Sequence, residues 1–153
     1  TYDLGVYAVS LIQTMMGVEP ESVKAIGSFN EDQIDVYTTG IFEYAGGARA
    51  SFDCGMVLAT EKNACLDRFQ IHGTKGSISS VSFGFNCPGK LSYEIKTFDG
   101  RRDIRIVEAP HNYRLEVEQL GRCITEGETP YVTEDFSVSL ARTIDRVLKE
   151  IDY

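Results

Sequence analysis

The chain has 153 residues, of which 42% are hydrophobic and 25% charged, and this size and composition are typical of one globular domain. Its net charge of −8 argues against binding to nucleic acid or to an anionic membrane surface, because both attract clusters of Lys and Arg. No apolar run approaches the roughly 20 residues that cross a bilayer, so we expect a soluble protein.

The first predicted element is a helix over residues 4–16. Asp3 is placed to cap its start, and Gly17 is placed to end it. Further apolar residues fall on its other sides, which predicts a helix buried on two sides. The remaining chain offers no obvious second layer for it, so we expect residues 1–153 to be one domain of a larger protein. The main apolar stripe is expected at Leu4, Ala8, Leu11 and Met15.

The middle of the chain predicts β-structure. Runs rich in β-branched and aromatic residues are separated by turn residues, and Asp99-Gly100 is a strong two-residue hairpin signal. Short connections favour antiparallel pairing. The predicted strands cover residues 23–29, 34–44, 48–58, 64–72, 77–83, 91–97 and 102–108.

Two amphipathic helices are predicted after the strands. Asn112 is placed to cap the first and Gly127 to end it, while Thr133 is the N-cap candidate of the second. The apolar stripe of the first helix is Tyr113, Val117, Leu120 and Ile124. That of the second is Phe136, Leu140, Ile144, Val147 and Ile151.

The fold class that follows is α+β, with a large, open, predominantly antiparallel sheet and helices packed on one face. No predicted helix is left to cover the other face. A half-apolar open face is typical of a subunit interface, so we expect a homodimer or a higher oligomer. An ordinary solvated face is the alternative. By the parity of the strands, this face carries Tyr37, Ile41, Arg49, Asp53 and Val57.

The four cysteines and two histidines give little sign of a metal or disulfide site. No CxxC pair occurs, and neither His72 nor His111 has a partner at metal-ligand spacing. We therefore expect no metal. Free thiols are typical of a reducing compartment, which points to the cytoplasm. The cysteines are Cys54, Cys65, Cys87 and Cys123.

Asp3 and Tyr7 are the candidate catalytic residues. They lie four positions apart, which would put them on one helical face, and a carboxylate beside a phenol can orient a proton donor. A phenol ordinarily titrates near pH 10, so catalysis near neutrality needs a cation nearby. No Lys or Arg lies within ten residues of Tyr7. The alternative is that Asp3 only caps the helix and Tyr7 only packs.

Several short motifs occur in an order that resembles the C-terminal domain of the glucose-fructose oxidoreductase / inositol dehydrogenase / MocA family. The first is Asp3-x-Gly5-x-Tyr7, followed by an apolar helix that ends at residues 17–20 (GVEP). The others are residues 71–78 (IHGTKGSI), 112–118 (NYRLEVE) and 127–130 (GETP). Many members carry histidine where this chain has Tyr7, so the chain resembles the tyrosine-bearing branch that contains dihydrodiol dehydrogenases.

The resemblance implies a two-domain oxidoreductase. Its N-terminal Rossmann domain would bind NAD or NADP and supply a catalytic lysine, and neither the glycine-rich motif nor the Glu-Lys-Pro motif occurs here. This domain would supply substrate contacts for a sugar, polyol or dihydrodiol-like alcohol, with Tyr7 as acid/base and Asp3 helping to position the site. The chain alone would be inactive.

A second function stays open. A fold does not guarantee its family's chemistry, so the chain could be a non-enzymatic dimerisation or ligand-sensing module.

Overall fold

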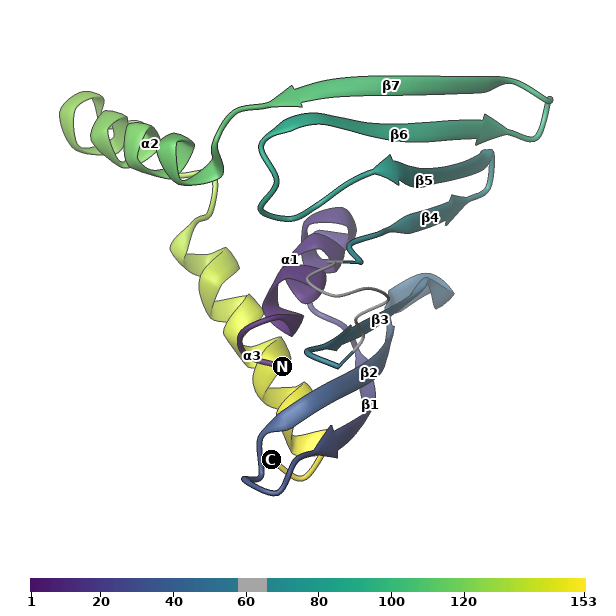
Figure 1. Ribbon diagram of the computed structural model, residues 1–153, viewed down its shortest axis with the longest axis vertical. Coiled ribbons are helices and arrows are strands. Elements are labelled where there is room, and N and C mark those ends of the chain that lie inside the picture. The colour runs from purple at the N-terminus through teal and green to yellow at the C-terminus, as the bar shows by residue number, and fades with distance from the viewer. Residues whose placement is uncertain (58–65) are drawn as a thin grey trace. The chain divides into compact units, whose positions relative to one another are not determined.

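The computed structural model describes residues 1–57 and 66–153 (Figure 1). These residues form three helices and seven strands at the predicted places, although β4 begins only at Gln70 and residues 66–69 are not strand. The α+β class and the open, antiparallel sheets are confirmed. The predicted strand over residues 64–72 falls partly outside the described residues, as does Cys65. The elements are α1 (Gly5–Met16), β1 (Ser22–Phe29), β2 (Asp35–Glu43), the 3-10 turn η1 (Ala45–Gly47), β3 (Arg49–Gly55), β4 (Gln70–Gly73), β5 (Gly76–Ser82), β6 (Gly89–Thr97), β7 (Arg102–Ala109), α2 (Asn112–Glu126) and α3 (Glu134–Glu150).

The described strands form two sheets, where the sequence predicted one. The strand orders are β1-β2-β3 and β4-β5-β6-β7, and every pair is antiparallel. Each strand pairs with its neighbour in sequence through a short connection, but β3 and β4 are not joined in this way. Accordingly, the described residues divide into two compact units. Unit 1 contains residues 1–57 and 131–153, and unit 2 contains residues 66–130.

Unit 1 holds the hydrophobic core, on the face of its sheet that α1 and α3 cover. α1 packs on β3, α3 packs on β1, and the two helices pack on each other. The rings of Phe42 and Phe52 lie 5.4 Å apart at the centre of the covered face. Gly40 is required there, because a Cβ atom at this position would overlap the Phe52 ring. The predicted stripe of α3 is confirmed, with Ile144, Val147 and Ile151 all buried.

The predicted buried stripe of α1 was wrong in phase. Its buried positions are Gly5, Val9 and Gln13, whereas Leu4 and Met15 are exposed. The helix is apolar on nearly every side, so hydrophobic periodicity could not single out the side that packs.

Two of the predicted helix caps were also wrong. The N-cap of α1 is Leu4, with no side-chain hydrogen bond, so Asp3 does not cap the helix. The N-cap of α2 is His111, because Asn112 donates its side-chain amide to the carbonyl of Phe85 instead (2.7 Å). Thr133 does cap α3, accepting from the backbone N–H of Phe136 at 3.1 Å. The predicted helix ends at Gly17 and Gly127 are confirmed, and both are left-handed.

The uncovered face of the three-stranded sheet carries the residues expected from strand parity. Tyr37, Ile41, Arg49 and Asp53 alternate with the buried positions of β2 and β3. Ile26 of β1 lies on the same face and is 74% exposed, and Ile41 is 53% exposed. Val57 lies beyond the end of β3 and is also exposed.

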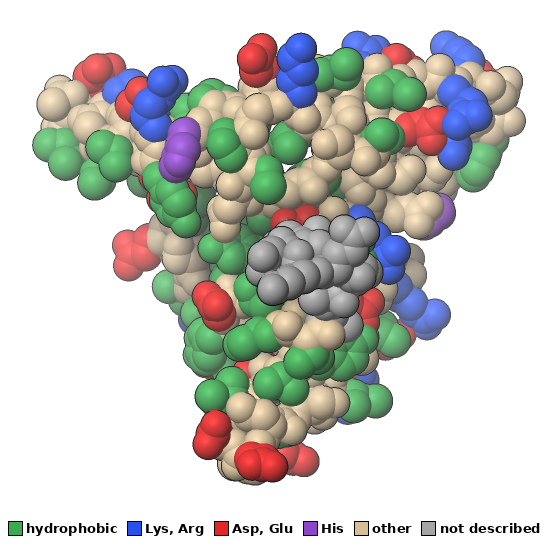
Figure 2. Space-filling view, in the orientation of Figure 1, with side chains coloured by type: hydrophobic (Ala, Val, Ile, Leu, Met, Phe, Trp, Pro, Cys, Tyr) green, Lys and Arg blue, Asp and Glu red, His purple; other side chains and the backbone are tan. Residues whose placement is uncertain are grey.

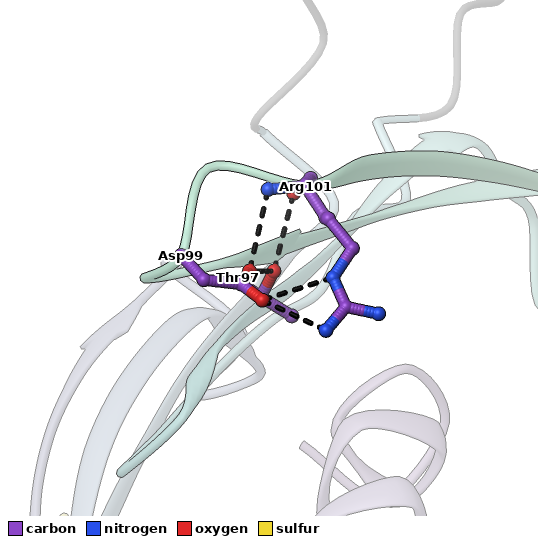
Figure 3. Close-up of polar contacts among 3 residues, drawn as sticks. All are labelled: Thr97, Asp99 and Arg101. Carbon is purple, nitrogen blue, oxygen red and sulfur yellow. Dashed lines mark hydrogen bonds and ion pairs between the residues drawn. The ribbon is translucent and has the colours of Figure 1, made fainter.

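Unit 2 is built around the β6–β7 hairpin. At its tip, Asp99 accepts hydrogen bonds from the Thr97 hydroxyl and from the backbone and side chain of Arg101 (Figure 3). These bonds hold the pKa of Asp99 below its usual value. Gly100 follows with a φ of 88°, so the turn lies where it was predicted. The two-residue loop was wrong, because β6 ends at Thr97 and β7 begins at Arg102.

The second helix of the chain leaves its apolar stripe uncovered. Figure 2 shows hydrophobic side chains gathered along α2, and the four predicted stripe residues are between 58% and 75% exposed. Of the three predicted helices, only α1 and α3 therefore cover sheet in the part of the chain that the structure describes.

We expect Ile144→Ala to lower the free energy of unfolding by about 2–5 kcal/mol, because Ile144 is 2% exposed and its truncation leaves a cavity. Val138→Ala is the matched control on the same helix. It should change the free energy by less than about 0.5 kcal/mol, because Val138 is 42% exposed. Urea unfolding followed by circular dichroism measures both, and equal effects would contradict the described core.

Candidate active site

The first turn of α1 is held against the sheet by close packing. Gly5 is buried against β3, and a Cβ atom at this position would meet the sulfur of Cys54 at 3.0 Å. Burial also raises the pKa of the Cys54 thiol, which disfavours its reactive thiolate form. Only glycine lets the helix start this close to the strand, and this contact sets where the following residues of α1 lie.

A buried polar network holds the residues ahead of α1. The hydroxyl of Thr1 donates to the hydroxyl of Thr38 on β2 at 2.8 Å, and Thr38 donates to the carboxylate of Asp35 at 3.4 Å.

The two sequence-predicted site residues lie at the start of α1. Tyr7 is in the first turn of the helix and half-buried. Asp3 lies in the turn that precedes the helix and is exposed. The helix begins only at Gly5, so Asp3 lies in the turn and Tyr7 in the helix. The spacing of four residues therefore does not put both side chains on one face of the helix.

Sequence reasoning missed a second tyrosine in the same segment. The hydroxyl of Tyr2 donates to the carboxylate of Asp145 on α3 at 3.1 Å. This hydrogen bond, together with the charge of Asp145, raises the pKa of Tyr2. A phenol held to a carboxylate keeps its proton more firmly, so Tyr2 is a poor acid. Tyr2 therefore ties the segment to α3.

Metal and thiol chemistry have little basis in the described residues. They contain no cluster of three or more His, Cys, Asp or Glu side chains that could hold a metal ion. Cys54, Cys87 and Cys123 are free thiols. The start of α1 offers a phenol and a carboxylate for chemistry, and this pair can move or orient a proton.

No helix in the described part of the chain is long and apolar enough to cross a membrane.

The chain is similar over nearly all of its length to two curated dehydrogenases. A D-xylose 1-dehydrogenase (NADP(+)) of Haloferax volcanii is 29% identical over 152 residues, which cover 98% of this chain and 45% of that protein. A trans-1,2-dihydrobenzene-1,2-diol dehydrogenase of Oryctolagus cuniculus is 28% identical over 161 residues, which cover 97% of this chain and 46% of that protein. The chain thus spans a little under half of the length of these relatives.

A solved structure shares the fold. KijD10, a 3-ketoreductase from Actinomadura kijaniata solved in complex with NADP, superposes with a TM-score of 0.81 at 18% sequence identity. The match covers 97% of this chain and 46% of that one. In addition, residues 1–79 match the GFO/IDH/MocA C-terminal domain. Because this match covers more than half of the 153 residues, the chain belongs to the GFO/IDH/MocA C-terminal domain family.

Proposed function

We propose that this chain is the substrate-side domain of an NAD(P)-dependent oxidoreductase and that a Rossmann domain precedes it in the intact protein. One observation carries the proposal. Nearly all of this chain matches a dehydrogenase in two cases, and in each case the match covers less than half of the dehydrogenase. The named activities of these relatives support a sugar or a related alcohol as substrate. The free thiols among the described residues support a cytoplasmic protein.

The residues of this chain do not hold a dinucleotide by themselves. A strand, a glycine-rich turn and a helix in succession would form a pyrophosphate site, and the glycine-rich motif is missing from the sequence. Two cavities, one beside Gln13 and one beside Lys75, include neither Asp3 nor Tyr7 in their linings. We therefore assign cofactor binding mainly to the preceding domain. NADP is favoured over NAD, because NADP(+) is named for the Haloferax volcanii enzyme and NADP for the ketoreductase complex.

Tyr7 is the proposed acid/base in this reaction. The dinucleotide, bound mainly by the preceding domain, would supply the hydride acceptor for a substrate alcohol. Tyr7, in its phenolate form, would take up the hydroxyl proton as the alcohol becomes a carbonyl. Asp3 lies four residues earlier and exposed, where its carboxylate can help to orient the substrate hydroxyl. The cation that Tyr7 needs comes from the lysine of the preceding domain. Tyr7 lies on a helix fixed by the contact of Gly5 with Cys54, so its position is set by a rigid element.

The uncovered face of the three-stranded sheet is the proposed homodimer surface. It presents Ile26 and Ile41, both more than half exposed, beside the charged residues Arg49 and Asp53. A mixture of apolar and charged residues is usual at a subunit interface.

The isolated chain is expected to show no saturable binding of NADH or NADPH, because the dinucleotide site lies in the other domain. Fluorescence titration of each reduced dinucleotide measures this directly. Binding with a micromolar dissociation constant would contradict the assignment of the cofactor site to the preceding domain.

In the intact enzyme, Tyr7→Phe should lower kcat by about 10²-fold or more, because it removes the proton acceptor while keeping the ring. D-xylose with NADP+ and a dihydrodiol with NADP+ are the assays suggested by the relatives. Tyr153→Phe is the matched control, since it removes an exposed hydroxyl from a ring stacked on Phe29 and should leave kcat unchanged. Full activity of the Tyr7→Phe variant would return Tyr7 to a packing role, whereas an inactive parent protein would favour the non-enzymatic alternative.

For the dimer, sedimentation velocity of the chain should give the mass of two copies. The double variant Ile26→Glu/Ile41→Glu should give a monomer, because each dimer would bury four carboxylates. Ile124→Glu is the control on α2, where the side chain is 75% exposed, and it should remain dimeric. A monomeric parent chain, or a double variant that still dimerises, would rule out this face.

A further inference from the structure

A cavity of about 610 Å³ lies within unit 1, where the end of α1 meets the start of α3. Its volume falls in the range of small-molecule sites. It is at the opposite end of α1 from Asp3, and Gln13 follows Tyr7 by six residues, about 9 Å along the helix. The residues that give it its chemistry are Gln13, Val18, Tyr131, Val132, Asp135 and Phe136.

Gln13 lines this cavity and carries an unused hydrogen-bond acceptor. The side chain is 6% exposed, because it follows Val9 on the buried stripe of α1. Its amide nitrogen donates to the carbonyl of Phe136 on α3 at 3.1 Å. Its amide oxygen is buried and has no hydrogen-bond partner among the described residues. Buried polar atoms in folded proteins are nearly always paired, so this oxygen indicates a missing donor.

The charges around the cavity favour a positively charged donor. Asp135 contributes a carboxylate, and no Lys, Arg or His is among the described residues that line the cavity. The C-terminal end of α1 also lies there, and free carbonyl groups at a helix end attract cations. The N-terminal end of α3, which carries a partial positive charge, also lies at the cavity. The side-chain cap of Thr133 and the carboxylates of Glu134 and Asp135 in the first turn compensate this charge.

The mouth of the cavity is apolar and open to solvent. Tyr131 is 83% exposed, Val132 is 61% exposed and Val18 is 58% exposed, although all three line the cavity. Exposed apolar side chains around a cavity are typical of a surface that a ligand covers. They would contact an apolar, ring-sized body, and the ring of Tyr131 could also face a cation.

We propose that this cavity is a binding site for a small organic cation that carries an N–H donor on an apolar, ring-sized body. The donor binds the amide oxygen of Gln13, the positive charge lies near Asp135, and the apolar body displaces water from Val18, Val132 and Tyr131. The site does not use the residues proposed for catalysis and does not depend on the dehydrogenase role.

Nitrogen-15 NMR titration of the 153-residue chain tests the proposal with four probes: benzylamine, benzyl alcohol, toluene and benzoate. Benzylamine should give saturable shifts at the side-chain amide of Gln13 and the backbone amide of Ser139. Its dissociation constant should be about tenfold lower than that of benzyl alcohol or toluene. Benzoate should not bind, because its carboxylate offers no donor. Equal binding of benzylamine and benzoate would overturn the proposal.

Two variants locate the contact. Gln13→Met keeps the length of the side chain but removes the acceptor, so benzylamine should bind about tenfold more weakly, at a level near that of toluene. Val18→Arg places a cation at the mouth and should abolish benzylamine shifts, and it remains a valid test if Gln13→Met fails to fold. Val81→Arg is its control at a valine of similar exposure (60%) in unit 2. Undiminished binding by Val18→Arg would overturn the proposal.

Discussion

The structure depends on covering one face of a three-stranded sheet. That face carries Phe42 and Phe52, which are almost fully buried, and the two helices of unit 1 lie over it. Burial of apolar surface stabilises a fold by roughly 25 cal/mol for each Å², so the position of α1 is dictated by this contact. The candidate catalytic residues and the cavity at Gln13 lie on α1 or against it, and are therefore placed by the hydrophobic core.

The two ends of α1 are fixed by different means. At the start, the packing of Gly5 on Cys54 and the hydroxyls of Thr1 and Thr38 hold the segment to the sheet. At the end, the amide of Gln13 holds the helix to α3 through the carbonyl of Phe136. A short, rigid helix pinned at both ends gives a fixed frame for a proton-transfer residue. It also fixes the geometry of the cavity at its other end.

Most of the fold was predictable because turn residues and periodicity are local signals. The seven strands and the cap at Thr133 followed from them, the latter reinforced by two acidic residues in the first turn. The division into two sheets was not predictable, since strand pairing across residues 56–69 depends on contacts distant in sequence. The side of α1 that packs was missed for the same reason. Gln13 in an apolar helix suggests a solvent-facing position, and only the packing of α3 buries it.

The order of elements along the chain has a consequence for how the protein is made. Unit 2, residues 66–130, is inserted between the sheet of unit 1 and the helix that closes its core. A ribosome therefore releases α1 and β1 to β3 long before α3 exists, so the part of the apolar face that α3 covers stays open while unit 2 is made. Such long-range contacts slow folding and leave hydrophobic surface open to chaperones or to aggregation. The close approach of Ile151 to Gly27 is thus made only after all of unit 2 has been synthesised.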